Sequence, residues 1–232
     1  MTIKAPLEHY YDKLGYDPKK IANVTIGAKY LACQLTNGKL GICATLEQEF
    51  PSNFSFDKTP DLGWICDRIL LNAWFNANLN NVRNYPEDKD IFDFLAFTKY
   101  RKIVMVGYFA SLVKKFNEAK IELNIFDLCE DFPDVIPLSK QKEYIKQADA
   151  LILTSTSISN SSFEHLIEAA GDNTEIFLLG PSTILDPDMY KYPNVKKIFG
   201  MVFYSNEQEV IEMIAKDHGT PSFSKLGHKV YL

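Results

Sequence analysis

The stretch "ADALILTST", Ala148 to Thr156, decides the fold, because it is a short apolar run that ends abruptly in hydroxyl side chains. Four other runs have the same character: "KIVMVGYF" (102–109), "IELNIFDLC" (121–129), "EIFLLGPS" (175–182) and "VKKIFGMVF" (195–203). Stretches of helical character lie between and after them, at about 109–119, 139–147, 161–170, 186–191 and 206–216. Apolar runs that alternate with helices are typical of a parallel sheet covered on both faces. The sequence therefore predicts an α/β fold, with a Rossmann-like domain built on a mostly parallel sheet of five strands.

Open α/β sheets bind ligands beyond the carboxyl ends of their strands, so the residues at these ends are candidate site residues. Gly107 ends the first strand, but no glycine follows it at the other positions of the G-x-G-x-x-G dinucleotide motif. Asp127 ends the second strand and lies 20 residues after Gly107, which is the offset of a ribose-binding acid. A capping or solvent-facing aspartate has the same signature, so both interpretations of Asp127 stay open.

The third strand end carries the richest polar sequence, "TSTSISNSSFEHLIEAAG", from Thr154 to Gly171. Its candidate ligand-binding residues are Thr154, Thr156, Asn160 and Ser162. Ser161 and Glu164 have the spacing of a helix capping box, and Gly171 suits the end of that helix. Helix-start amides beside hydroxyls favour an anionic or polar ligand. The alternative is that the hydroxyls only bond the neighbouring backbone.

The fourth strand ends in "LLGPSTILDP", Leu178 to Pro187, which adds Gly180, Pro181 and Ser182 to the candidate ligand-binding residues. Gly180 allows a turn as the chain leaves the sheet, and Pro181 fixes φ near −65° at the corner. Because the carboxyl ends of parallel strands meet at one edge, we expect this turn to form one wall of a polar pocket shared with the third strand end.

An N-terminal hairpin is predicted where "KYLACQLT" (29–36) and "KLGICATL" (39–46) flank Asn37-Gly38, a strong two-residue turn signal. In this register Thr36 faces Lys39, and Cys33 and Cys43 lie on opposite faces, where they cannot form a joint metal site. The residues expected to share one apolar face are Leu31, Cys33, Leu35, Leu40, Ile42 and Ala44.

A long helix is predicted from Asp61, as its cap, to about Leu79, and a short second helix over 87–97. On the long helix Arg68, Asn72 and Asn76 recur every four residues and form one polar stripe. The stripe faces either solvent or a cleft, and in the second case Asn72 and Asn76 are ligand-binding candidates. We expect a domain boundary near "FTKYRK" (97–102), with an α+β domain of hairpin and helices over residues 1–98 and the Rossmann-like domain over residues 99–232.

The composition narrows the class of protein. The chain has 232 residues, 46% of them hydrophobic, which is enough for a sizeable core. A net charge of −5 without a basic cluster argues against a nucleic-acid partner. No apolar run approaches the roughly 18 residues of a membrane span, and no signal peptide is recognisable, so no membrane association is expected. The four cysteines are widely spaced, which indicates a reduced, cytoplasmic protein.

Asp127, Cys129, Glu130 and Asp131 form a compact group of acids and a thiol. Such oxygens beside a soft sulfur could hold a divalent metal, although no histidine is near in the sequence. A structural zinc site is therefore not expected here, and a metal-carrier function is kept as an alternative.

Four segments together resemble the "putative heavy-metal chelation" family: "LLNAWFNAN" (70–78), "LILTSTSISNSSFEHL" (151–166), "LLGPSTILDP" (178–187) and "NVKKIFGMVF" (194–203). The resemblance runs from about Ile26 to Phe203. It implies a small N-terminal domain like the capping domain of enolases, a Rossmann-like domain, and a site in the crevice between them. Carried over by motif, the site residues are Asn72, Asn76, Thr154, Thr156, Asn160 and the Gly180-Pro181-Ser182 turn. The family's Gly-Thr pair is replaced by Ser161-Ser162, which keeps the second hydroxyl but loses the glycine.

Three functions remain open from the sequence. The first is a protein that binds a small polar or anionic molecule between its domains, in making or handling a metal-chelating compound. The second is a non-catalytic metal carrier, and the third is a nucleotide- or S-adenosylmethionine-dependent enzyme. No pair of activated nucleophile and base is recognisable, so the sequence does not decide whether the protein is an enzyme. It also leaves open the cofactor, the substrate, the metal and whether the protein is a homo-oligomer.

Overall fold

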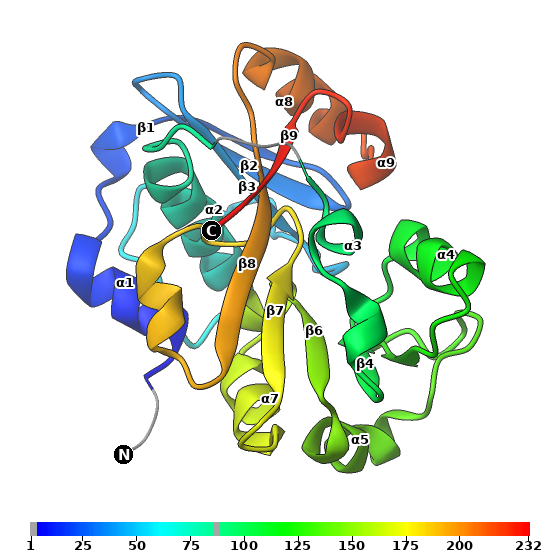
Figure 1. Cartoon of the computed structure of the whole chain (residues 1–232). Coiled ribbons are helices and arrows are strands. Elements are labelled where there is room, and N and C mark those ends of the chain that lie inside the picture. Colours follow the sequence, from blue (N-terminus) through cyan, green and yellow to red (C-terminus); the bar gives the residue numbers. More distant parts are fainter. Residues whose placement is uncertain (1–3, 86–88) are drawn as a thin grey trace.

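The computed structural model describes residues 4–85 and 89–232, which form two sheets and the helices around them (Figure 1). The smaller sheet is antiparallel, in the order β1 (Ile21–Ile26), β2 (Tyr30–Leu35), β3 (Leu40–Ala44). The larger sheet has the order β5 (Asn124–Phe126), β4 (Ile103–Val106), β6 (Ala150–Thr154), β7 (Glu175–Leu179), β8 (Val195–Val202), β9 (His228–Tyr231). The α/β fold is thereby confirmed.

The five predicted strands, β4 to β8, all pair in parallel. The sheet has a sixth strand that the sequence did not predict: β9, which pairs antiparallel with β8. Its four residues, His228 to Tyr231, contain only one fully buried side chain, that of Val230. A strand so short and so weakly apolar gives no recognisable pattern.

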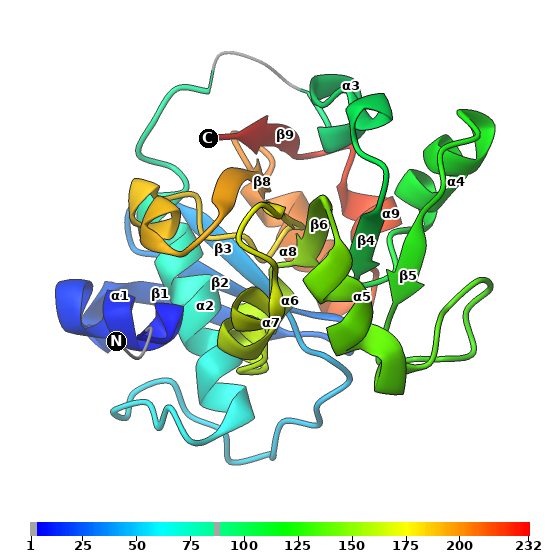
Figure 2. The same ribbon diagram turned by 60° about the horizontal axis from the view of Figure 1, so that its bottom comes forward.

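Helices cover both faces of the large sheet, as its continuous apolar strands require. α5 (Gln141–Gln147) and α7 (Phe163–Ala169) lie on one face and α3 (Ile91–Phe94) on the other (Figure 2). α4 (Ala110–Glu118) packs with α3 in one apolar cluster, whereas α5 and α7 belong to another. Alternate strand residues divide between these clusters, for example Val104 and Val106 against Ile103 and Met105.

The hairpin register differs from the predicted one by one residue. Leu31 faces Cys43 and Cys33 faces Gly41, because the loop contains three residues and is closed by the hydrogen bond from Leu35 N–H to the Lys39 carbonyl. Gly38 lies in this loop at φ 86°, as such loops favour. One slipped residue reverses the faces of the second strand. Cys33 and Cys43 therefore lie on the same face, which corrects the expectation that they are on opposite sides.

The two faces of the small sheet contact different helices. The face with Cys33 and Cys43 packs on α2 (Ile65–Leu79), and the face with Leu40 and Ile42 packs on α8 (Glu207–Ala215) and α9 (Thr220–Phe223). Figure 1 shows α8 and α9 beside the small sheet, although they follow the large one in sequence. Burial raises the pKa of the Cys43 thiol to about 11 and that of Cys33 to about 12, so neither is a thiolate at neutral pH.

The long helix α2 begins later than predicted. It starts at Ile65 after the N-cap residue Trp64, while the Asp61 side chain accepts a hydrogen bond from Gly63 N–H in a turn ahead of the helix. The predicted helix over 87–97 is reduced to α3 and a 3-10 turn, η2 (Phe97–Lys99), and its residues 87 and 88 lie outside the described part of the chain. The segment predicted as helical over 186–191 is a 3-10 helix, η4 (Pro187–Lys191).

Several further elements were not predicted: α1 (Pro6–Leu14), η1 (Pro18–Lys20), β1, α6 (Thr156–Ser159) and α9. The 3-10 turn η3 (Leu138–Lys140) begins the segment that was predicted as helical over 139–147. Within residues 4–85 and 89–232, no helix has the length and apolar character that crossing a bilayer requires. The division at residue 98 stays a prediction, and one apolar cluster contains residues from both sides of it, from Leu7 to Val230.

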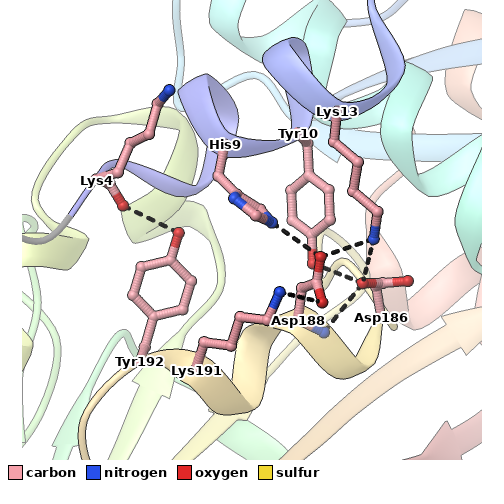
Figure 3. A network of polar contacts seen from close by, with 8 residues as sticks. All are labelled: Lys4, His9, Tyr10, Lys13, Asp186, Asp188, Lys191 and Tyr192. Atoms are coloured by element: carbon pink, nitrogen blue, oxygen red, sulfur yellow. Dashed lines mark hydrogen bonds and ion pairs between the residues drawn. The ribbon is translucent and has the colours of Figure 1, made fainter.

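Hydrogen bonds and ion pairs between charged side chains connect α1 with η4 (Figure 3). The Asp188 carboxylate is its centre: it lies 2.7 Å from Lys13 Nζ, 2.8 Å from Lys191 Nζ and 2.9 Å from His9 Nε2. Beside it, the Tyr10 hydroxyl donates to Asp186 at 3.3 Å. The hydrogen bond from Lys13, followed by those from Lys191 and His9, holds the pKa of the Asp188 carboxyl well below its usual value.

Replacing Asp188 with asparagine is expected to lower the free energy of unfolding by about 1–2 kcal/mol at pH 7. Because the folded pKa is depressed, the stabilisation is complete above the unfolded pKa, near about 4, and is lost as the pH falls below it. Urea unfolding at a series of pH values should show the difference between wild type and variant shrink as the pH drops below about 4. Asp172→Asn, an exposed loop change, is the control. A difference that is constant across this range would contradict the role of Asp188.

Candidate functional site

A cleft of about 1000 Å³ opens at the carboxyl ends of β4, β5 and β6. It contains six residues that the sequence predicted as ligand-binding: Gly107, Asp127, Thr154, Thr156, Asn160 and Ser162. Leu46 and Glu47, which follow β3 of the small sheet, line it from the N-terminal part of the chain. These six residues, from three neighbouring strand ends, therefore line one cleft.

The cleft lies where the chain reverses its direction across the sheet. β4 is followed by β5 on one side and by β6 on the other, so the switch point falls between β4 and β6. Ligands of open α/β sheets bind at such a point. Gly107, at φ 99°, ends β4 there, and a Cβ at this position would lie only 2.7 Å from Thr154 Cβ. Glycine is therefore required for the two strand ends to meet.

The hydroxyls after β6 divide into two sets by position. Thr154 and Thr156 are half-buried, line the cleft and share a hydrogen bond of 3.0 Å between their Oγ1 atoms. The intervening Ser155 is buried and bonds Thr183 Oγ1 at 2.6 Å, away from the cleft. Ser157 and Ser159 donate to the carbonyls of Thr154 and Thr156. Thr154 and Thr156 therefore have the position expected of ligand-binding hydroxyls, whereas Ser155, Ser157 and Ser159 bond groups inside the protein.

Asn160 and Ser162 form the corner between α6 and α7. Asn160 Oδ1 accepts hydrogen bonds from Ser162 N–H at 3.0 Å and from Ser162 Oγ at 2.6 Å. The predicted capping box does not form, because Ser161 is at φ 61° and Ser162 occupies the N-cap without a side-chain cap bond. The turn therefore directs Asn160 and Ser162 to the cleft that both of them line.

Two carboxylates of the cleft, Asp127 and Glu130, accept hydrogen bonds from nearby backbone N–H groups. Asp127 accepts Tyr108 N–H at 2.7 Å and Cys129 N–H at 2.8 Å, one on each carboxylate oxygen. Glu130 accepts Leu138 N–H at 2.8 Å. These bonds shape the β5 loop around the end of β4. They leave lone pairs on each carboxylate, since each oxygen can accept more than one hydrogen bond.

Two aromatic rings stack at the side of the cleft. Tyr108 and Phe132 are 4.5 Å apart between ring centroids, with planes at 11°, and both rings line the cleft. Phe132 and its neighbour Leu128 are exposed to 43% and 73%. Apolar side chains so exposed at the mouth of a cleft are available to a ligand.

The lining is strongly acidic. Its charged members are Glu47, Asp127, Glu130 and Asp131, and the part of the lining that the structure describes contains no lysine, arginine or histidine. Even so, no group of three or more His, Cys, Asp or Glu side chains within the described residues is placed to hold a metal ion. The set of Asp127, Cys129 and Glu130 considered from the sequence is therefore not brought together as ligands.

Three predicted site residues are buried away from the cleft. Asn72 Nδ2 donates to the Ser182 carbonyl at 2.8 Å, and Asn76 Nδ2 donates to the Ile42 carbonyl at 2.9 Å. Ser182 Oγ accepts Ala44 N–H at 3.0 Å. The polar stripe of α2 thus faces neither solvent nor a cleft at these positions. Its asparagines join the small sheet and the Gly180–Thr183 turn to the helix, and Asn80 extends the series with two bonds to residues 183 and 185.

The remaining two predicted residues, Gly180 and Pro181, line a smaller cavity of about 130 Å³. Phe109 lines both this cavity and the cleft. The turn after β7 is therefore next to the cleft without forming its wall, and Thr183 uses its hydroxyl to bond the Gly180 and Phe199 carbonyls.

Some residues of the cleft were not predicted from the sequence. Leu46 and Glu47 follow the hairpin and are distant in sequence from the other lining residues, so no local pattern links them to the rest of the cleft. The Glu47 backbone has φ 58°, which no sequence rule predicts for glutamate. Tyr108 could have been found, because it directly follows Gly107 at the strand end.

Comparison with known proteins gives a consistent result. Two family models, both described as "Putative heavy-metal chelation", match residues 90–232 and 8–113. A DUF364-family protein of unknown function from Pyrococcus horikoshii has a similar structure, with a TM-score of 0.81, 18% identity and 98% of each chain covered. A protein of unknown function from the same family in Desulfitobacterium hafniense gives a TM-score of 0.76, 19% identity and 97% coverage of each chain. No curated protein matches significantly.

Proposed function

This chain belongs to the family described as "Putative heavy-metal chelation", and from that premise we propose that its cleft binds a small polar compound of positive charge, such as a metal ion enclosed in a chelator. The observation that carries the proposal is the lining at the switch point: hydroxyl and amide groups beside four carboxylates, without a basic side chain among the described lining residues. In this account the protein takes part in handling a chelated metal.

The charge of the lining supports a polar ligand of positive charge rather than the anionic ligand that the sequence also allowed. Carboxylates on several sides of a cleft produce a negative potential that attracts cations and repels anions. The hydroxyls of Thr154 and Thr156 and the amide of Asn160 add groups that accept and donate hydrogen bonds. The lining therefore supports a polar, cationic ligand in preference to an anionic one.

A chelated metal suits the cleft better than a bare ion. The described residues provide no preformed set of three ligands, and the Asp127 oxygens already accept backbone N–H groups. The residues present thus do not fit a resident metal ion bound directly by side chains. A metal whose coordination shell is filled by a chelator needs only outer hydrogen bonds and charge, which this cleft offers.

Calorimetric titration with probes of different charge tests the proposal. Hexaamminecobalt(III) cannot exchange its ligands, so it reports binding through outer hydrogen bonds alone. We expect it to bind at least about tenfold more tightly than the anionic nickel–EDTA complex, because four carboxylates line the cleft. The double change Glu47→Gln and Asp131→Asn should weaken it by about tenfold, whereas Glu49→Gln, outside the lining, should not.

The result that contradicts the proposal is equally definite. Tighter binding of nickel–EDTA than of hexaamminecobalt(III) would reverse the inferred charge of the ligand. Full-strength binding of free Ni²⁺, one ion per chain, in both the wild type and the Glu47/Asp131 variant would instead support a metal carrier with its ligands elsewhere.

A nucleoside-bearing ligand is the second candidate, because Asp127 and the stacked Tyr108 and Phe132 rings lie at one side of the cleft. An aromatic ring can stack on a base, and a carboxylate at this strand end can accept ribose hydroxyls. The lack of further glycines after Gly107 argues against a dinucleotide. Adenosine and S-adenosylmethionine in the same titration test this candidate, and Phe132→Ala should remove their binding. Cytoplasmic location and the enolase-like character of the N-terminal part stay predictions, and the sequence makes no prediction of enzymatic activity or oligomeric state.

A further inference from the structure

Arg68 is the first residue of the polar stripe on α2, one helical turn before Asn72, and its side chain contacts the segment that forms the cleft. Its Nε donates a hydrogen bond to the Ser159 carbonyl at 2.7 Å, and its Nη1 donates to the Leu62 carbonyl at 2.9 Å. Both acceptors are backbone oxygens, and the Arg68 side chain is half-buried. Figure 2 shows α2 beside α6, the short helix that ends at Ser159. Arg68 thereby connects α2 with the end of α6.

The Ser159 carbonyl lies directly ahead of the corner between α6 and α7. Asn160 is the next residue, and the hydrogen bonds between Asn160 and Ser162 close the corner. Ser161, between them, has φ 61°, a conformation that a non-glycine residue keeps only where the surrounding structure enforces it. A charge-assisted hydrogen bond from a neighbouring helix is one such constraint, because it is stronger than a bond between neutral groups. Arg68 therefore constrains the corner from α2.

From these contacts we propose that Arg68 is a positioning residue: it holds the corner so that Asn160 and Ser162 face the compound bound in the cleft. The inference rests on the proposed function, because it assumes that these two lining residues contact that compound. A guanidinium suits the task, since its rigid, planar set of donors can bond two fixed carbonyls at once. A lysine ammonium keeps the charge, but its flexible stem does not fix both bonds.

Calorimetric titration of two Arg68 variants with hexaamminecobalt(III) tests the inference. Arg68→Met should weaken binding of the probe about tenfold and Arg68→Lys about threefold, because lysine retains one of the two bonds at most. A charge effect alone would act in the opposite direction, since removing a positive charge near the cleft favours a cationic probe. Asn76→Ala is the matched control: it removes a buried hydrogen bond from the same helix to the Ile42 carbonyl and should leave the affinity unchanged. If both Arg68 variants keep the wild-type affinity, or lose no more of it than Asn76→Ala does, the inference is overturned.

A second measurement reports on the corner without the probe and decides the question if Arg68→Met does not fold. In the NMR spectrum of Arg68→Lys, the signals of the Ser162 amide and the Asn160 side-chain amide should shift, and the Ser162 amide should exchange its hydrogen faster than in the wild type. The side-chain amide of Asn80, which bonds the Thr183 carbonyl, should keep its wild-type signal. A wild-type protein that does not bind hexaamminecobalt(III) would contradict the proposed function. Unchanged Ser162 and Asn160 signals in Arg68→Lys would instead overturn the role of Arg68, so the two failures are distinguishable.

Discussion

Replacing Gly41 with valine is expected to prevent the chain from folding, with a loss of more than about 4 kcal/mol in the free energy of unfolding. Gly41 is buried in β3 where the strand crosses α2. A Cβ at this position would lie 2.1 Å from the Ala73 carbonyl oxygen and 2.2 Å from the Ala77 nitrogen. Both are helix backbone atoms, so no side-chain rotation relieves the overlap. Soluble yield and urea unfolding by circular dichroism measure the effect.

Gly63→Ala is the matched control for this change. An added Cβ there meets only the Asp61 side chain, at 3.1 Å, which can move. Its effect should stay below about 1 kcal/mol. A folded Gly41→Val protein with an unfolding midpoint near the wild-type value would mean that the small sheet does not pack on α2 as closely as described.

The second large effect concerns ligand binding. Replacing both Thr154 and Thr156 with valine is expected to weaken hexaamminecobalt(III) binding about 100-fold, because two hydrogen bonds of about 1.4 kcal/mol each are lost. Stability should fall by less than about 1.5 kcal/mol, since the two hydroxyls bond each other at 3.0 Å and the further bond lost, from Thr156 N–H to Thr154 Oγ1, is long at 3.4 Å. Calorimetric titration and thermal unfolding of the same samples measure both quantities.

Ser155→Ala, between the two threonines, should give the opposite result. Its hydroxyl is buried against Thr183, so its loss should lower the free energy of unfolding by about 1–3 kcal/mol and leave probe affinity unchanged. Asn72→Ala should behave likewise, since its amide bonds the Ser182 carbonyl inside the protein. If Ser155→Ala or Asn72→Ala weakens the probe as strongly as the threonine pair does, the division of this segment into lining and buried residues is wrong.

The large sheet was predictable because each of its parallel strands is buried on both faces. Continuous apolar runs such as Leu151 to Leu153 follow from that burial and are visible in the sequence. The hairpin register was not predictable from the sequence, because Asn37-Gly38 fits both a two-residue loop and the three-residue loop that formed. The choice depends on packing: the observed register places Cys33 and Cys43 together on α2, a contact between segments distant in sequence.

The part of the candidate site that lies at the carboxyl ends of the parallel strands was predictable. Because ligands of open α/β sheets bind at these ends, the sequence indicated six residues that line the cleft: Gly107, Asp127, Thr154, Thr156, Asn160 and Ser162. The same reasoning indicated Ser182. A strand end has two sides, however, and Ser182 lies on the side that packs on β3 and α2. The polar stripe with Asn72 could not be assigned, because buried asparagines that bond backbone and asparagines that bind a ligand have the same helical spacing.

The most direct measurement is the position of cobalt in crystals soaked with hexaamminecobalt(III), read from the anomalous scattering of the metal. We expect one dominant peak in the switch-point cleft, within outer-sphere hydrogen-bonding reach of Thr154, Thr156 and Glu47. This peak should vanish in crystals of the Thr154→Val, Thr156→Val protein. A saturable complex in solution whose cobalt lies elsewhere on the chain, with the cleft empty, would contradict the central claim.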